Sequence, residues 1–112
     1  MFGFQRLDAY QAATKFLAEG TRLAAKVPRG QGELVDQLRR AALSIPLNIA
    51  EGSGKFSREA RRFYTIARGS ALECAAILDA LSALGLLADD DLEQGRAFLE
   101  RVVSMLTGLI RG

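Results

Sequence analysis

The chain has 112 residues, the length of one domain, with 49% hydrophobic and 25% charged residues and a formal net charge of +2, a composition typical of a globular protein. No apolar run approaches the roughly 18 residues that a membrane-spanning helix needs, and residues 1–5 lack the features of a secretory signal, so we expect a cytoplasmic protein without membrane contact. With no histidine and one cysteine, the chain lacks an imidazole base, a Ser-His-Asp triad and zinc ligands, and we expect no enzyme activity, metal or cofactor.

The first expected helix covers residues 7–27. The side chains expected on its buried face recur at alternating spacings of three and four residues, which is typical of one helix face. They are Leu7, Tyr10, Thr14, Leu17, Thr21 and Ala24. Pro28, Gly30 and Gly32 follow and are expected to end this helix.

The second expected helix covers residues 33–50, and the same spacing rule identifies its buried face. The residues on that face are Leu34, Leu38, Ala41, Ile45 and Ile49. The segment Gly52-Ser53-Gly54 is rich in turn-forming residues and predicts the next break.

The third expected helix begins at Ser57, a favoured N-cap residue, and ends before Gly85. Its buried face follows a pattern close to a heptad repeat. The residues are Phe63, Ile66, Ser70, Cys74, Ile77, Leu81 and Leu84. We interpret Cys74 as a buried hydrophobic residue, because no histidine is present to activate its thiol. A glycine inside a helix is unfavourable, so Gly69 suggests a close approach between helices or subunits.

The fourth expected helix begins in the acidic run at residues 89–91, because acids suit the positive end of a helix dipole, and Asp90 with Glu93 has capping-box spacing. Its buried face comprises Leu92, Leu99, Val102, Leu106 and Leu109. Short connections favour antiparallel neighbours. We therefore expect residues 1–112 to form a single all-α domain, an antiparallel up-down-up-down four-helix bundle.

Two segments of the second and third helices resemble a known family. Residues 37–52 read QLRRAALSIPLNIAEG, and residues 63–73 read FYTIARGSALE. They resemble the four-helix bundle proteins first noticed as reading frames within intervening sequences of bacterial large-subunit ribosomal RNA genes. Phe4, Leu7 and Tyr10 suit the start of that family.

The resemblance carries expectations about assembly and partners. It implies a four-helix up-down bundle that assembles as a homopentamer. It also implies kinship with the accessory protein of diversity-generating retroelements, a basic pentameric barrel that binds a reverse transcriptase and nucleic acid. On this resemblance, the expected partners are other copies of the chain, RNA or DNA, and a reverse transcriptase.

A polar stripe runs along the second helix beside its buried face. Arg40, Ser44, Asn48 and Glu51 follow one another at spacings of four, four and three residues. Buried polar groups need partners. One interpretation is a structural network that fixes helix register, with Arg40 or Asn48 reaching Glu73 on the third helix. The other is a ligand-binding or catalytic site, although the stripe has no nucleophile and no phosphate-binding loop.

Charge is distributed unevenly along the chain. Residues 1–68 contain twelve Lys or Arg and six Asp or Glu, a net +6, whereas residues 69–112 contain three and seven, a net −4. The basic half includes a candidate nucleic-acid-binding group, called here the basic cluster. Its members are Lys55, Arg58, Arg61, Arg62 and Arg68. Cations near a helix start are disfavoured by the helix dipole, so folding alone would favour acids there.

Two interpretations of the basic cluster remain open. It is either a surface for nucleic acid or a solvated face with salt bridges between subunits. Phe56, Phe63 and Tyr64 lie nearby in the sequence, either to stack on bases or to fill a core or interface.

Three functional hypotheses follow. The leading one is a non-enzymatic homo-oligomeric scaffold whose basic face contacts nucleic acid or a nucleic-acid enzyme such as a reverse transcriptase. The alternative is a protein–protein interaction module without nucleic-acid contact. The third is an enzyme that uses carboxylates and Arg40 around Asn48 and Glu51.

Overall fold

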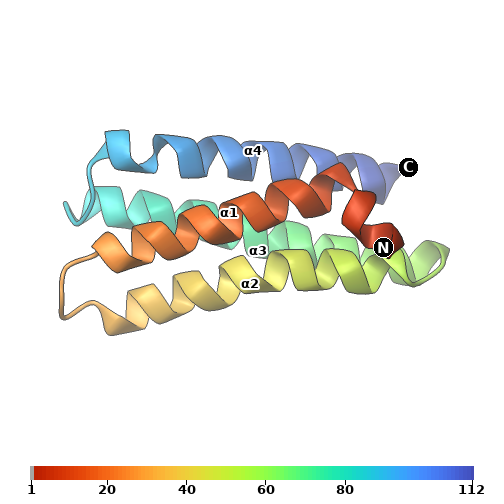
Figure 1. Ribbon diagram of the computed structural model, residues 1–112, viewed down its shortest axis with the longest axis horizontal. Coiled ribbons are helices and arrows are strands. Elements are labelled where there is room, and N and C mark those ends of the chain that lie inside the picture. The colour runs from red at the N-terminus through yellow and green to blue at the C-terminus, as the bar shows by residue number, and fades with distance from the viewer. Residues whose placement is uncertain (1) are drawn as a thin grey trace.

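The computed structural model describes residues 2–112 and shows an all-α chain. A short 3-10 helix, η1 (Gly3–Arg6), is followed by α1 (Asp8–Lys26), α2 (Gly32–Ser53), α3 (Ser57–Ala83) and α4 (Asp89–Arg111). No residue from 2 to 112 lies in a strand. The four α-helices lie side by side along the longest dimension of a body measuring 43 × 24 × 21 Å (Figure 1). The predicted all-α class with four α-helices is confirmed for residues 2–112.

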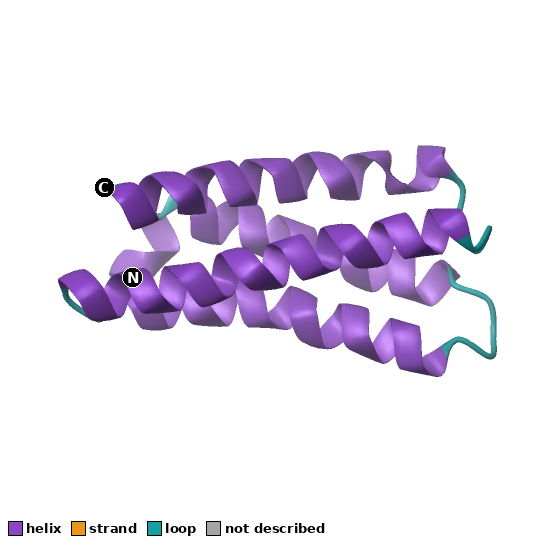
Figure 2. Ribbon diagram, turned by 180° about the vertical axis from the view of Figure 1, so that it is seen from behind, coloured by secondary structure: helices purple, strands orange, loops and turns teal. Residues whose placement is uncertain are grey.

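The two ends of the bundle carry different connections (Figures 1 and 2). The α1–α2 and α3–α4 loops lie at one end, which we call the acidic end because Asp89–Asp91 begin α4 there. The α2–α3 loop and both chain termini lie at the other end, which we call the basic end because that loop contains Lys55 and is followed by Arg58, Arg61 and Arg62. The basic cluster's residues at the start of α3 and the acidic run at the start of α4 thus lie at opposite ends of the bundle.

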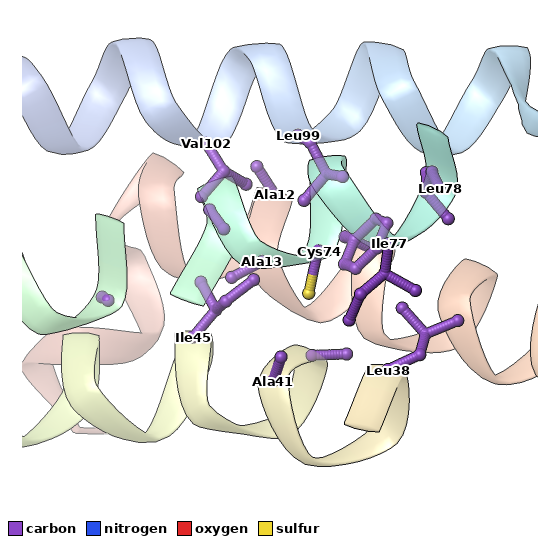
Figure 3. Packing of buried hydrophobic residues seen from close by; sticks show 14 of the residues in the cluster. Ala12, Ala13, Leu38, Ala41, Ile45, Cys74, Ile77, Leu78, Leu99 and Val102 are labelled. Carbon is purple, nitrogen blue, oxygen red and sulfur yellow. The ribbon is translucent and has the colours of Figure 1, made fainter. Parts of the chain in front are cut away.

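The core is built from one face of every helix. α1 and α3 each pack against both α2 and α4. Figure 3 shows side chains from all four helices meeting in one interior. Among them are Ala12, Ala13, Leu38, Ala41, Ile45, Cys74, Leu99 and Val102. The predicted buried faces of α2 and α4 are confirmed, with their outermost members Leu34 and Leu109 partly buried.

The predicted buried face of α1 is correct only in part: Ala24 is buried as expected, and Leu7 packs against the core. The core face of α1 is rotated toward residues that the pattern ignored, namely Ala9, Ala12, Ala13, Phe16, Gly20 and Leu23. Thr21 is exposed, and Tyr10 and Leu17 lie at the edge of the core. Small side chains let neighbouring helices approach closely, so alanine and glycine take the central positions and larger residues flank them.

The first half of the α3 face was also predicted wrongly, whereas Cys74, Ile77 and Leu81 are buried as expected. Leu84, the last residue of the predicted face, is 63% exposed. Tyr64, Ala67 and Ala71 are buried in place of Phe63, Ile66 and Ser70. The neighbouring helix explains the rotation. A Cβ at Gly52 of α2 would lie 2.8 Å from the Tyr64 ring, so the absent side chain leaves room for that ring.

Two local predictions also need correction, and of the two approaches expected at Gly69, the one between helices of the same protomer is not found among residues 2–112. The N-cap of α3 is Phe56, and Ser57 is the first helical residue, with a φ of 42° in the left-handed region. The N-cap of α4 is Ala88, so Asp90 lies inside the first turn and forms no capping box with Glu93. A Cβ on Gly69 would meet no atom within 4 Å, so no helix of the same protomer approaches it closely.

The glycine predicted to end α3 is in place. Gly85 follows the C-cap residue Leu84 with a φ of 69°, a conformation that glycine adopts without a steric penalty. No helix within residues 2–112 is long and apolar enough to cross a membrane.

Candidate nucleic-acid interface

The basic cluster gathers around the start of α3. Lys55 lies in the α2–α3 loop, and its other four members lie on α3. Arg58, Arg61 and Arg62 are exposed, whereas Lys55 and Arg68 are half-buried. In the described chain, the ion pairs join Arg22 to Glu19, Lys26 to Asp91, and Arg96 to Asp79 and Asp89. No member of the basic cluster is in any of them, so its charge is left uncompensated.

The acidic end contrasts with this arrangement. Arg96 bridges Asp79 and Asp89 at 3.2 and 3.1 Å, and Lys26 reaches Asp91 at 2.6 Å. Hydrogen bonds from Ser82 and Arg96 lower the pKa of Asp89, and one from Lys26 lowers the pKa of Asp91. Lys26 and Arg96 at the acidic end are therefore held by carboxylates of the same protomer, whereas Arg29 in the α1–α2 loop is in no ion pair of the described chain.

Two members of the basic cluster share one aromatic ring. The Lys55 Nζ atom lies 6.0 Å and the Arg62 Cζ atom 5.9 Å from the ring centroid of Phe63. Cation–π contacts at exposed sites contribute about 0.5–1 kcal/mol each. The half-buried Phe63 therefore anchors two cations at one place on the basic end.

Arg68 is set apart from the rest of the basic cluster. Its Nε donates a 2.9 Å hydrogen bond to Thr107 Oγ1, and the Thr107 hydroxyl donates to the Val103 carbonyl at 2.8 Å. Arg68 is thus tied to α4, and ten residues of helix separate it from Arg58, a rise of about 15 Å. The structure brings the other four together near the α2–α3 loop.

The three nearby aromatic residues have different environments. Tyr64 is buried in the core, and burial raises the pKa of its hydroxyl. Phe63 is half-buried beneath Lys55 and Arg62, whereas Phe56 is 90% exposed. Of the three, Phe56 alone has its ring available to a ligand.

Sequence reasoning missed a second aromatic group at the basic end. The rings of Phe2 and Phe4 are nearly parallel with centroids 5.8 Å apart, and Phe4 meets Tyr10 edge-on at 4.9 Å. A hollow of about 440 Å³ lies between this group and the end of α2. It is lined by Phe2, Gly3, Phe4, Leu7, Ala50, Ser53, Gly54 and Tyr64. No spacing rule could have found it, because η1 meets α2 only in the folded chain.

The polar network predicted on α2 forms only in part. Asn48 Nδ2 donates to the Ser44 carbonyl and hydroxyl oxygens, both at 2.9 Å, and the Ser44 hydroxyl lies 2.9 Å from that of Ser70. The remaining predicted members, Arg40, Glu51 and Glu73, are exposed, and no hydrogen bond within residues 2–112 joins their side chains to the network. Water can satisfy these long charged side chains at the surface, whereas Ser44, Asn48 and Ser70 link α2 to α3.

Cys74 lies in the core, as expected. Burial, together with the nearby charge of Glu73, raises the pKa of its thiol to about 12. The group is therefore a neutral thiol at physiological pH, which makes it a poor nucleophile. In the part of the chain that the structure describes, no three His, Cys, Asp or Glu side chains are grouped so that they could hold a metal ion.

A comparison with protein families gives a match over most of the chain. A family model described as 23S rRNA-intervening sequence protein matches residues 5–108. This match covers nearly the whole chain and confirms the resemblance found in α2 and α3. A search of curated proteins found no match.

Proposed function

The chain belongs to the 23S rRNA-intervening sequence protein family, and we propose that it is a non-enzymatic, homo-oligomeric helical scaffold whose basic end contacts nucleic acid or a nucleic-acid enzyme such as a reverse transcriptase. One observation carries this proposal. Among residues 2–112, Lys55, Arg58, Arg61 and Arg62 gather around the start of α3 and are in no ion pair with a carboxylate, whereas Lys26 and Arg96 at the acidic end are paired.

Unpaired cations suit a polyanionic partner. Each phosphate neutralised by a cation releases bound counterions, so binding weakens as salt rises. Four contacts per protomer correspond to a slope of about −3 to −4 in log K against log salt. Several protomers in one assembly would repeat the basic end and raise the overall avidity without further chemistry.

We propose further that the antiparallel up-down-up-down bundle assembles as a homopentamer. The number five comes from the family resemblance. The protomer supports assembly because it exposes large apolar side chains. Leu43 and Leu47, one turn apart on the outward side of α2, are 46% and 58% exposed, and Ile66 of α3 is 41% exposed. Large exposed apolar side chains on a helix face are typical of an interaction surface. Light scattering should give a mass near five times 12.1 kDa, and a stable monomer would contradict the assembly.

The nucleic-acid proposal is tested by removing charge. The R58A/R61A/R62A variant should lose most of its affinity for labelled RNA and DNA at low salt. The control R29A/R39A/R101A removes the same charge from exposed arginines that lie outside the basic cluster. It should keep most of the affinity. Undetectable binding by the wild-type protein, or equal losses in the two variants, would refute the proposal.

A protein–protein interaction module without nucleic-acid contact is the second candidate. The separation of charge along the bundle favours it, because the basic end of one copy is complementary to the exposed Asp90, Glu93 and Glu100 of another. If the basic end contacts the acidic end of another copy, R58A/R61A/R62A should lower the mass of the assembly and leave any nucleic-acid binding unchanged. Recovery of a specific protein partner from nuclease-treated extract would also favour this candidate.

A further inference from the structure

We propose that the basic end binds single-stranded nucleic acid, with an unpaired base stacked on the ring of Phe56 and the adjoining phosphates held by Lys55 and Arg58. This inference rests on the proposed function and specifies the class of nucleic acid. It starts from one side chain: Phe56 is 90% exposed, more than any other large hydrophobic residue in the described chain.

The fold gives no reason for phenylalanine at this position. Phe56 is the N-cap of α3, yet its side chain makes no capping hydrogen bond. Serine, threonine, aspartate or asparagine would satisfy a free amide of the first turn there. Phe56 is also absent from the core and from the partly buried residues packed against it. Folding alone would therefore favour a small polar residue in place of this aromatic ring.

The ring is presented by a short and well-defined connection. α2 ends at Ser53 and α3 begins at Ser57, so residues 54–56 form the whole loop. The amides of Gly54 and Lys55 donate to the carbonyls of Glu51 and Gly52 at 3.2 and 3.0 Å. A ring on such a turn loses less conformational freedom on binding than one on a flexible tail would.

The cations that flank Phe56 in the sequence identify the partner. Lys55 precedes Phe56 and Arg58 follows it by two residues, and neither is in an ion pair of the described chain. An exposed aromatic ring with a cation one residue before it and another two residues after it in the sequence is complementary to a ligand that joins flat apolar faces to phosphates. Aromatic side chains stack on bases of any identity, so the expected recognition has little sequence preference.

The stacking of a base on Phe56 also predicts tighter binding to single strands than to duplexes. Within a duplex, both faces of each base are covered by neighbouring base pairs, so a protruding ring reaches them only at the ends. In a single strand, bases can splay out and stack on an aromatic side chain. A surface that bound through charge alone would bind a normal single strand and an abasic strand with equal affinity.

The experiment uses three labelled 15-nucleotide probes on the full chain at fixed salt: a mixed-sequence single strand, its duplex, and an abasic strand with the same phosphates. The wild type should bind the normal strand at least about five-fold more tightly than the abasic strand, the lower limit of base–aromatic stacking. Phe56→Leu should remove this difference without changing affinity for the abasic strand. Phe56→Trp should retain it, and so should the control Leu84→Ala, which truncates another exposed apolar residue.

Three results would overturn the inference. Equal affinity of the wild type for normal and abasic strands would leave no role for stacking. An unchanged preference in Phe56→Leu would place the stacking elsewhere. A lower assembly mass for Phe56→Leu in light scattering would assign the ring to a subunit interface. Under any of these results, the proposed function stands if binding still requires Arg58, Arg61 and Arg62, whereas absence of binding to every probe at low salt refutes both.

Discussion

Replacing Gly52 with alanine should destabilise the bundle, although alanine is the better helix former. The new Cβ would lie 2.8 and 3.0 Å from Cε1 and Cδ1 of Tyr64 and 3.1 Å from Cβ of Phe63. Both neighbours are constrained: Tyr64 is buried in the core, and the Phe63 Cβ is fixed to the α3 backbone. The overlap can therefore be relieved only by moving α2 and α3 apart.

The expected change in the free energy of unfolding for Gly52→Ala is the sum of two opposing effects. Overpacking of this kind costs about 1–3 kcal/mol. Replacing a helical glycine with alanine returns about 1 kcal/mol. The expected net loss for Gly52→Ala is about 1 kcal/mol, or roughly 4 °C in Tm for a chain of this length.

Gly69→Ala is the matched control. It makes the same chemical change within a helix, but its Cβ would meet no atom within 4 Å in the protomer. It should raise stability by up to about 1 kcal/mol, so the two variants should differ by about 2 kcal/mol. Thermal unfolding followed by circular dichroism at equal protomer concentration measures this difference. A Gly52→Ala protein as stable as Gly69→Ala would refute the proposed fit of Tyr64 against Gly52.

Three further outcomes are expected. A thiol reagent at neutral pH should modify Cys74 only after unfolding, because burial raises its thiol pKa to about 12; rapid labelling of the native protein would contradict the structure. Leu47→Lys should lower the mass of the assembly in light scattering, whereas the control Leu84→Lys should leave it unchanged. The stabilisation from Asp91, whose folded-state pKa is lowered by Lys26, should be fully present above the ordinary Asp pKa of about 3.9 and be lost as pH falls through the lowered value. Lys26→Met should flatten the dependence of stability on pH in that acidic range, and an unaltered profile would show that the pair contributes nothing.

The buried faces could be predicted where large aliphatic residues carry the pattern. Ile45 and Ile49 on α2, and Leu99 and Val102 on α4, follow the spacing of one helix face and are buried. On α1 the same rule was right only in part, because residues as small as Ala13 and Gly20 share the core face with the large buried residues Phe16 and Leu23. Hydrophobic periodicity gives little weight to such residues, although close helix packing depends on them.

Other errors arose from contacts between helices. The burial of Tyr64 depends on Gly52 of the neighbouring helix, and the pattern within α3 alone favoured Phe63. The start of α3 shows a different limit of prediction from sequence, namely that of residue preferences at helix ends. Ser57 has the preferred chemistry of an N-cap, yet Phe56 occupies that position, so residue preference did not determine the local structure.

The candidate site was partly accessible from the sequence. The charges of Lys55, Arg58, Arg61 and Arg62 could be found by counting, because clustering in the sequence at a helix start implies clustering in space. The exposure of Phe56 could not be separated from the burial of Tyr64 without the fold. The absence of carboxylate partners for the basic cluster likewise depends on where distant acidic residues lie, and only the structure places those residues.

The salt dependence of nucleic-acid binding tests the central claim most directly. Dissociation constants for one labelled single strand should be measured from low to physiological salt, for the wild type and for R58A/R61A/R62A. If these three arginines each neutralise a phosphate, the variant's log–log slope should be shallower by about 2–3. Parallel lines for the two proteins would show that the arginines at the start of α3 contact no phosphate, and would contradict the account.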